Sequence, residues 1–170
     1  MDALPEPGPD VADPKKLFLR YLDFYRSVVV RKLDGLSDAE LRGTRLPSGW
    51  TPIELLTHLV HMEQRWLHWG FAAEQVEQPW GDNGPDGRWR VGADEALADL
   101  VARLHAGGEQ TRAIVVAAEL SDHAAVGGRF TDEADRPTLA WILFHVLQEY
   151  ARHAGHLDIV RELADESVGE

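Results

Sequence analysis

Apolar residues recur every three or four positions along four long segments, and this spacing constrains the fold of the chain more than any other feature. Such a repeat lines one face of a helix, and no segment shows the convincing apolar/polar alternation that is typical of a strand. The four segments run approximately over residues 14–35, 52–70, 94–119 and 138–164. We therefore predict an all-α protein whose four helices pack as a four-helix bundle.

The clearest helix start lies in the sequence SGWTPIELL, residues 48–56. Thr51 has the side chain of an N-cap, Pro52 suits the first helical position, and Glu54 completes a capping box. Asp13 and Pro14 start the first helix in the same way. The sequence SDAEL, residues 37–41, carries a capping-box pattern too and predicts one short additional turn.

The rest of the chain divides into a lead-in and loops. Residues 1–12 are acidic and rich in proline, so we expect a disordered lead-in, followed by a single domain over residues 13–166. Residues 71–92 are rich in Gly, Pro and Asp and contain Trp80 and Trp89. Loops of this length in a compact domain are often functional, and we expect this one to cover a pocket.

The composition excludes several function classes. The formal net charge of −12 opposes binding to nucleic acid or to an anionic membrane. No apolar run is long enough to span a membrane, and no signal peptide is recognisable, so we expect a cytoplasmic protein. The chain has no cysteine, so a transition metal would need His, Asp or Glu as ligands, and any thiol chemistry would need a thiol from outside the chain.

The sequence EYARHAGHLD, residues 149–158, contains the most suggestive polar residues. At 100° per residue, Glu149 and His153 project together at the edge of the apolar stripe of the last helix. A carboxylate there needs a partner. Either the pair binds a divalent cation, or the two side chains simply form a hydrogen bond with each other. His156 lies to one side of the pair.

The second helix supplies further histidines, beginning with His58 at less than two turns from its start. Taken alone, His58 is better explained as a hydrogen-bonded histidine at the edge of the core. His61, Arg65 and His68 share a face that we expect to be polar and solvated. The sequence contains two other histidines without a partner pattern, His105 and His123, which we expect at the surface or in loops.

Two motifs together resemble the DinB-like four-helix-bundle superfamily: SGWTPIELLTHLVHMEQRW and FHVLQEYARHAGHLDIVREL. The resemblance covers nearly the whole chain, and the mycothiol-dependent maleylpyruvate isomerases are more distant relatives. In this superfamily a histidine early in the second helix and two residues at i and i+4 in the last helix hold a divalent metal. The resemblance thus implies His58, Glu149 and His153 as metal ligands, with His156 beside them in a supporting role.

The same resemblance implies a metal-dependent enzyme that transfers a low-molecular-weight thiol such as mycothiol to a small molecule. Zn²⁺ is the favoured metal, and Ni²⁺ or Fe²⁺ are alternatives. Arg65 or Arg152 would hold an acidic group of the substrate. Two other interpretations stay open: a non-catalytic metal-binding or stress-response bundle, and a plain bundle with a Glu–His hydrogen bond. A homodimer through the outer faces of the bundle is also predicted.

Overall fold

The computed structural model describes residues 4–165 and is built from helices, with no strand among these residues. The predicted all-α class is therefore confirmed. Four long helices make up the bundle, and a π-helical segment, a short helix and a 3₁₀ turn join them. The elements are α1 (Pro14–Leu33), α2 (Asp38–Arg42), α3 (Pro52–Glu63), η1 (Gln64–Phe71), α4 (Leu97–Ala117), η2 (Glu133–Asp135) and α5 (Leu139–Asp165).

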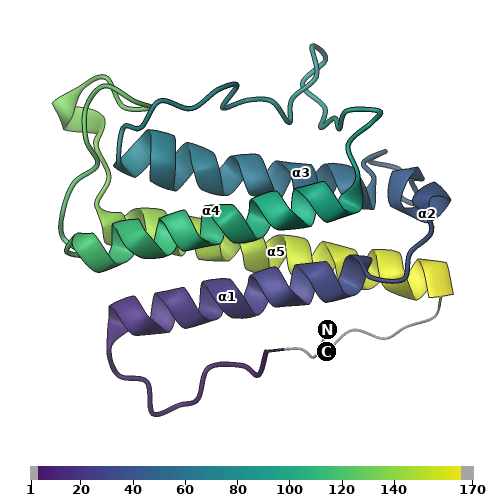
Figure 1. Ribbon diagram of the computed structural model, residues 1–170, viewed down its shortest axis with the longest axis horizontal. Coiled ribbons are helices and arrows are strands. Elements are labelled where there is room, and N and C mark those ends of the chain that lie inside the picture. The colour runs from purple at the N-terminus through teal and green to yellow at the C-terminus, as the bar shows by residue number, and fades with distance from the viewer. Residues whose placement is uncertain (1–3, 166–170) are drawn as a thin grey trace.

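The four long helices form a closed ring of contacts around one core. Helix α1 packs against α4 and α5, and α3 packs against the same two neighbours. The long connection from Ala72 to Ala96 runs back along the length of the bundle, so that α3 and α4 point the same way (Figure 1). The connection therefore lies over residues of α3, where the candidate site is located.

The capping signals in the sequence are confirmed. The Thr51 side chain accepts a hydrogen bond from the Glu54 amide, and the Glu54 carboxylate accepts one from the Thr51 amide. Ser37 and Glu40 form the same reciprocal pair at the start of α2. These bonds satisfy backbone donors that a helix start leaves free, which is why the sequence marks the starts so clearly.

Helix α3 continues directly into the wider π-helical segment η1. The amide of Ala72 donates to the carbonyl of Leu67, five residues earlier, at 2.9 Å. A π-helical segment turns successive side chains by a different angle from an α-helix and is frequent at functional sites. The 100° steps that describe α3 therefore do not carry over to Arg65 and His68.

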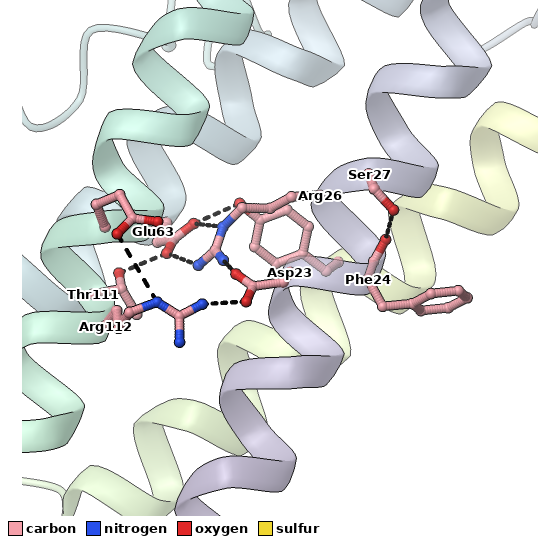
Figure 2. Close-up of polar contacts among 9 residues, drawn as sticks. Asp23, Phe24, Arg26, Ser27, Glu63, Thr111 and Arg112 are labelled. Carbon is pink, nitrogen blue, oxygen red and sulfur yellow. Dashed lines mark hydrogen bonds and ion pairs between the residues drawn. The ribbon is translucent and has the colours of Figure 1, made fainter. Parts of the chain in front are cut away.

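A buried polar cluster joins all four long helices (Figure 2). The Glu63 carboxylate of α3 forms an ion pair with Arg26 of α1, whose Nε lies 3.1 Å from Glu63 Oε2. Glu63 also accepts hydrogen bonds from Thr111 of α4 at 2.6 Å and from Tyr150 of α5 at 2.5 Å. The pKa of Glu63 is lowered, because the favourable contacts with Arg26, Thr111 and Tyr150 outweigh the cost of burial.

Helix α4 begins at Leu97, three residues later than predicted, because the carboxylate of Glu95 accepts a hydrogen bond from the Gly92 amide and holds a turn there. Gly107 and Gly108 lie in the middle of the continuous helix α4. A Cβ atom at Gly108 would come within 2.9 Å of the Arg26 guanidinium carbon. The glycine thus provides the space that the buried Arg26 requires.

Three other predictions concern membrane spans, the N-terminal lead-in and the domain limits. No helix among residues 4–165 has the length and apolar composition to cross a membrane. Residues 4–13 form no helix, and Glu6 accepts a hydrogen bond from the Tyr21 hydroxyl at 3.1 Å. Residues 1–3 of the expected lead-in and the predicted boundary at residue 166 lie outside the described residues, so the domain limits stay a prediction.

We expect Glu63→Ala to destabilise the protein by about 3–5 kcal/mol, because the substitution leaves the charge of Arg26 buried without a partner. Urea unfolding measures the change. Glu109→Ala is the matched control, since the Glu109 carboxylate is exposed and lies 4.0 Å from Arg112. Equal midpoints for the two variants would contradict the central role of Glu63.

Candidate metal centre

Three side chains meet where α3 packs against α5: His58, Glu149 and His153. Each offers one ligand atom, and these atoms all lie within 4.8 Å of one another. Glu149 Oε2 lies 3.2 Å from His153 Nε2 and 3.7 Å from His58 Nε2. The two predicted motifs, far apart in the sequence, therefore converge on one point.

A carboxylate behind His58 determines the orientation of its ring. His58 Nδ1 donates to Asp82 Oδ2 at 2.9 Å, so Nε2 is the nitrogen with a free lone pair, on the side of Glu149. Asp82 is fully buried and is held in turn by both terminal nitrogens of Arg65. A carboxylate that accepts from the far nitrogen of a histidine is the usual second partner of a metal-binding imidazole.

The charges around the three residues favour an ionised Glu149. The hydrogen bond from His153 and the nearby imidazole of His58 outweigh burial and hold the pKa of Glu149 far below its ordinary value. Burial lowers the pKa of His153, which favours its neutral form. Burial also acts against a charged His58, but Asp82 and Glu149 raise its pKa overall.

The donor set has the composition of a divalent transition-metal site. Two imidazoles and one carboxylate suit Zn²⁺, Ni²⁺ or Fe²⁺ and leave coordination positions open. Glu149 and His153 satisfy each other through their hydrogen bond, which would be sufficient in a bundle without a metal. His58 Nε2, however, is buried without a hydrogen-bond partner, because 3.7 Å is too long for a hydrogen bond to Glu149. The unsatisfied nitrogen beside two other donors is what a metal-binding histidine would show.

Trp89 in the long connection covers the two histidines. Its ring stacks on His58 with centroids 4.2 Å apart and meets the ring of His153 edge-on at 5.2 Å. Trp89 and Trp50 also line a cleft of about 660 Å³, which none of the three candidate ligands lines directly. The connection thus separates the three side chains from the cleft by a single indole ring.

The prediction that His61, Arg65 and His68 form a solvated face is wrong. Their exposed fractions are 7%, 4% and 3%. The long connection lies over them: a Cβ atom at Gly81 would come within 2.7 Å of the His61 ring, and Asp82 binds Arg65. The π-helical geometry of η1 also changes the direction of Arg65 and His68.

The remaining predicted residues differ in their exposure and in their partners. Arg65 donates to Asp82 and to the carbonyl of Pro79, so its guanidinium is already paired. Arg152 is exposed and lies 3.6 Å from Glu149. His156 Nδ1 lies 3.2 Å from His153 Nδ1, and the supporting role of His156 stays a prediction. His105 and His123 are exposed, as predicted.

Sequence reasoning missed Asp82 and the position of Trp89. Asp82 stands in the sequence GDNGPDG, residues 81–87 of the loop rich in Gly, Pro and Asp. No local signal relates a loop aspartate to a histidine 24 residues earlier. Trp89 was expected to pack over a pocket, and its contact with His58 specifies where.

Asp82→Ala is expected to destabilise the protein by about 3 kcal/mol, because Arg65 then keeps a buried charge with no carboxylate. Urea unfolding measures this loss, and trypsin cleavage after Arg88 or Arg90 should become faster as the connection loosens. Asp86→Ala, in the same connection but exposed, serves as the control. Identical unfolding of both variants would show that Asp82 does not anchor the connection.

A family model described as mycothiol S-transferase matches residues 17–166, which is most of the chain. The comparison with curated proteins gave no match. The matched family is a DinB-like family, so the predicted superfamily is confirmed, and the chain belongs to the mycothiol S-transferase family.

Proposed function

We propose that the protein is a metal-dependent mycothiol S-transferase, in which His58, Glu149 and His153 hold a divalent metal. Zn²⁺ is the favoured ion, and Ni²⁺ or Fe²⁺ are the alternatives. The observation that supports the metal most directly is the buried, unpartnered Nε2 of His58 beside Glu149 and His153. The family supports the thiol chemistry.

The chemistry requires a thiol that the chain cannot supply, because it has no cysteine. A divalent metal at the centre, when bound, lowers the pKa of a coordinated thiol toward neutrality and so favours the thiolate. In the transfer, the thiolate sulfur forms a bond to an electrophilic carbon of the acceptor, and the thiol proton passes to solvent. In a substitution, the departing group leaves with the electron pair of the bond that breaks. In an addition, the electron pair of the π bond moves to the neighbouring atom, which takes up a proton from solvent.

The chain's own residues prepare this step. Asp82 fixes the tautomer of His58, and Arg65 fixes Asp82. Trp89 shields both histidines from water on its side. A cleft of about 660 Å³ beside Trp89 has the size of a small-molecule site and would admit the thiol or its acceptor.

The metal is tested by elemental analysis of protein purified without a histidine tag. We expect about one divalent ion per chain in the wild type, as for a three-ligand site. His58→Ala and His153→Ala should remove most of it, because either change leaves only two protein ligands. His105→Ala, an exposed histidine outside the centre, should keep the wild-type content. The same metal content in all four proteins would rule out this centre.

The activity is tested with mycothiol and a panel of small electrophiles. We expect thiol-dependent turnover in the wild type and a loss of at least about a hundredfold in His153→Ala, equivalent to about 2.7 kcal/mol of transition-state stabilisation. A protein that holds stoichiometric metal but shows no thiol-dependent turnover would instead be the non-catalytic metal-binding bundle. The homodimer and the cytoplasmic location also stay predictions.

A further inference from the structure

Arg129, in the loop between α4 and α5, is a partly buried cation without an anionic partner. Its guanidinium forms no hydrogen bond or ion pair with any residue in 4–165, and its Nη1 atom is buried. The guanidinium carbon lies 4.1 Å from the ring centroid of Trp66 and 5.4 Å from that of Trp80. Cation–π contacts stabilise the charge but leave the N–H donors unsatisfied.

Two other arginines show what Arg129 lacks. Arg65 also lies against Trp80, at 4.5 Å, but Asp82 neutralises it. Arg26 is buried and paired with Glu63. Burial and then repulsion from Arg65 lower the pKa of Arg129, and no carboxylate among residues 4–165 is close enough to oppose them.

The position of Arg129 is built firmly into the fold. Its amide donates to the carbonyl of Trp69 in η1 at 3.1 Å, and the amide of Ala125 donates to the carbonyl of Phe71 at 2.8 Å. A Cβ atom at Gly128 would come within 2.0 Å of the Trp69 carbonyl oxygen, so only glycine allows this approach. The loop therefore fixes the backbone that carries the guanidinium.

Arg129 also lies near the candidate metal centre. His145 packs against Trp66, with ring centroids 4.4 Å apart, and interacts electrostatically with both Arg129 and Glu149. His145 precedes Glu149 by one helical turn, a rise of about 6 Å. A group bound at Arg129 would thus lie on the side of α5 that carries His145, about one turn from Glu149.

We propose that Arg129, with Trp66 and Trp80, forms a binding site for the carboxylate of a small molecule. The guanidinium fork matches a carboxylate in two parallel hydrogen bonds, and the two indole rings favour a flat group. A single unpaired cation suits a monoanion better than a phosphate dianion, because Asp82 already neutralises Arg65. Trp80 is half exposed, so the site is open to solvent on that side.

The Arg129 site adds a substrate class to the proposed function. Only the role of this site in turnover rests on that function. The acceptor of the thiol would carry a carboxylate that Arg129 holds, with its electrophilic carbon directed toward the centre formed by Glu149, His58 and His153. Carboxylate binding itself requires neither the thiol nor a metal, and the two claims can therefore be tested separately.

Binding is measured by calorimetry on the full chain with benzoate, benzamide and inorganic phosphate. We expect benzoate to bind at least about tenfold more tightly than neutral benzamide and more tightly than phosphate. Because a metal would also attract carboxylates, the same titration is repeated in His153→Ala, where benzoate binding should persist. Equal binding of benzoate and benzamide, tighter binding of phosphate, or loss of benzoate binding in His153→Ala would overturn the proposal.

Arg129→Gln should weaken benzoate binding by about tenfold or more, since it removes the charge and the fork. Arg20→Gln, which removes an exposed arginine of α1, changes the net charge equally and should leave binding unchanged. Should Arg129→Gln fail to fold, Arg129→Lys keeps the charge, loses the fork and should still bind more weakly. Wild-type binding in the folded Arg129 variant would contradict the site.

Turnover separates this proposal from the proposed function. In Arg129→Gln, kcat/KM should fall for electrophiles that carry a carboxylate and stay unchanged for neutral ones. An absence of thiol transfer with every electrophile in the wild type would refute the transferase but leave the benzoate result standing. An equal fall for charged and neutral electrophiles would refute Arg129 as the carboxylate site.

Discussion

The buried carboxylate of Glu63 is the contact on which the arrangement of the bundle depends. From α3 it bonds to α1, α4 and α5, through Arg26, Thr111 and Tyr150 (Figure 2). A charge in the core is tolerated only while all its partners are in place. Apolar packing tolerates small shifts between helices, whereas this hydrogen-bond geometry does not. We infer that Glu63 sets the relative register of the four helices.

That register carries directly into the candidate metal centre. His58 precedes Glu63 by five residues on α3, and Glu149 directly precedes Tyr150 on α5. The hydrogen bond between Tyr150 and Glu63 therefore lies about one to two helical turns from the point where His58 meets Glu149 and His153. A slip of one turn between the helices would separate the three side chains by about 5 Å.

A second buried arginine–carboxylate pair attaches the long connection to the bundle. Arg65 holds Asp82, Asp82 orients His58, and the same connection brings Trp89 onto both histidines. Arg129 contrasts with Arg26 and Arg65, because its backbone is also held by hydrogen bonds but no carboxylate in the described part of the chain pairs with it. The two paired arginines have structural partners, and the unpaired one is where we place a ligand.

The sequence by itself determined the helices and the candidate ligand pair on α5, because both depend on residues a few positions apart. Capping by Thr51 and Glu54 and the i, i+4 spacing of Glu149 and His153 are local features of this kind. Only the tertiary structure decided the burial of His61 and Arg65 and the role of Asp82. These depend on a connection that folds back over α3, and the bond from His58 to Asp82 spans 24 residues. Local periodicity gives the direction in which a side chain leaves its own helix. Whether that side chain is exposed or buried depends on the segment that packs over the helix.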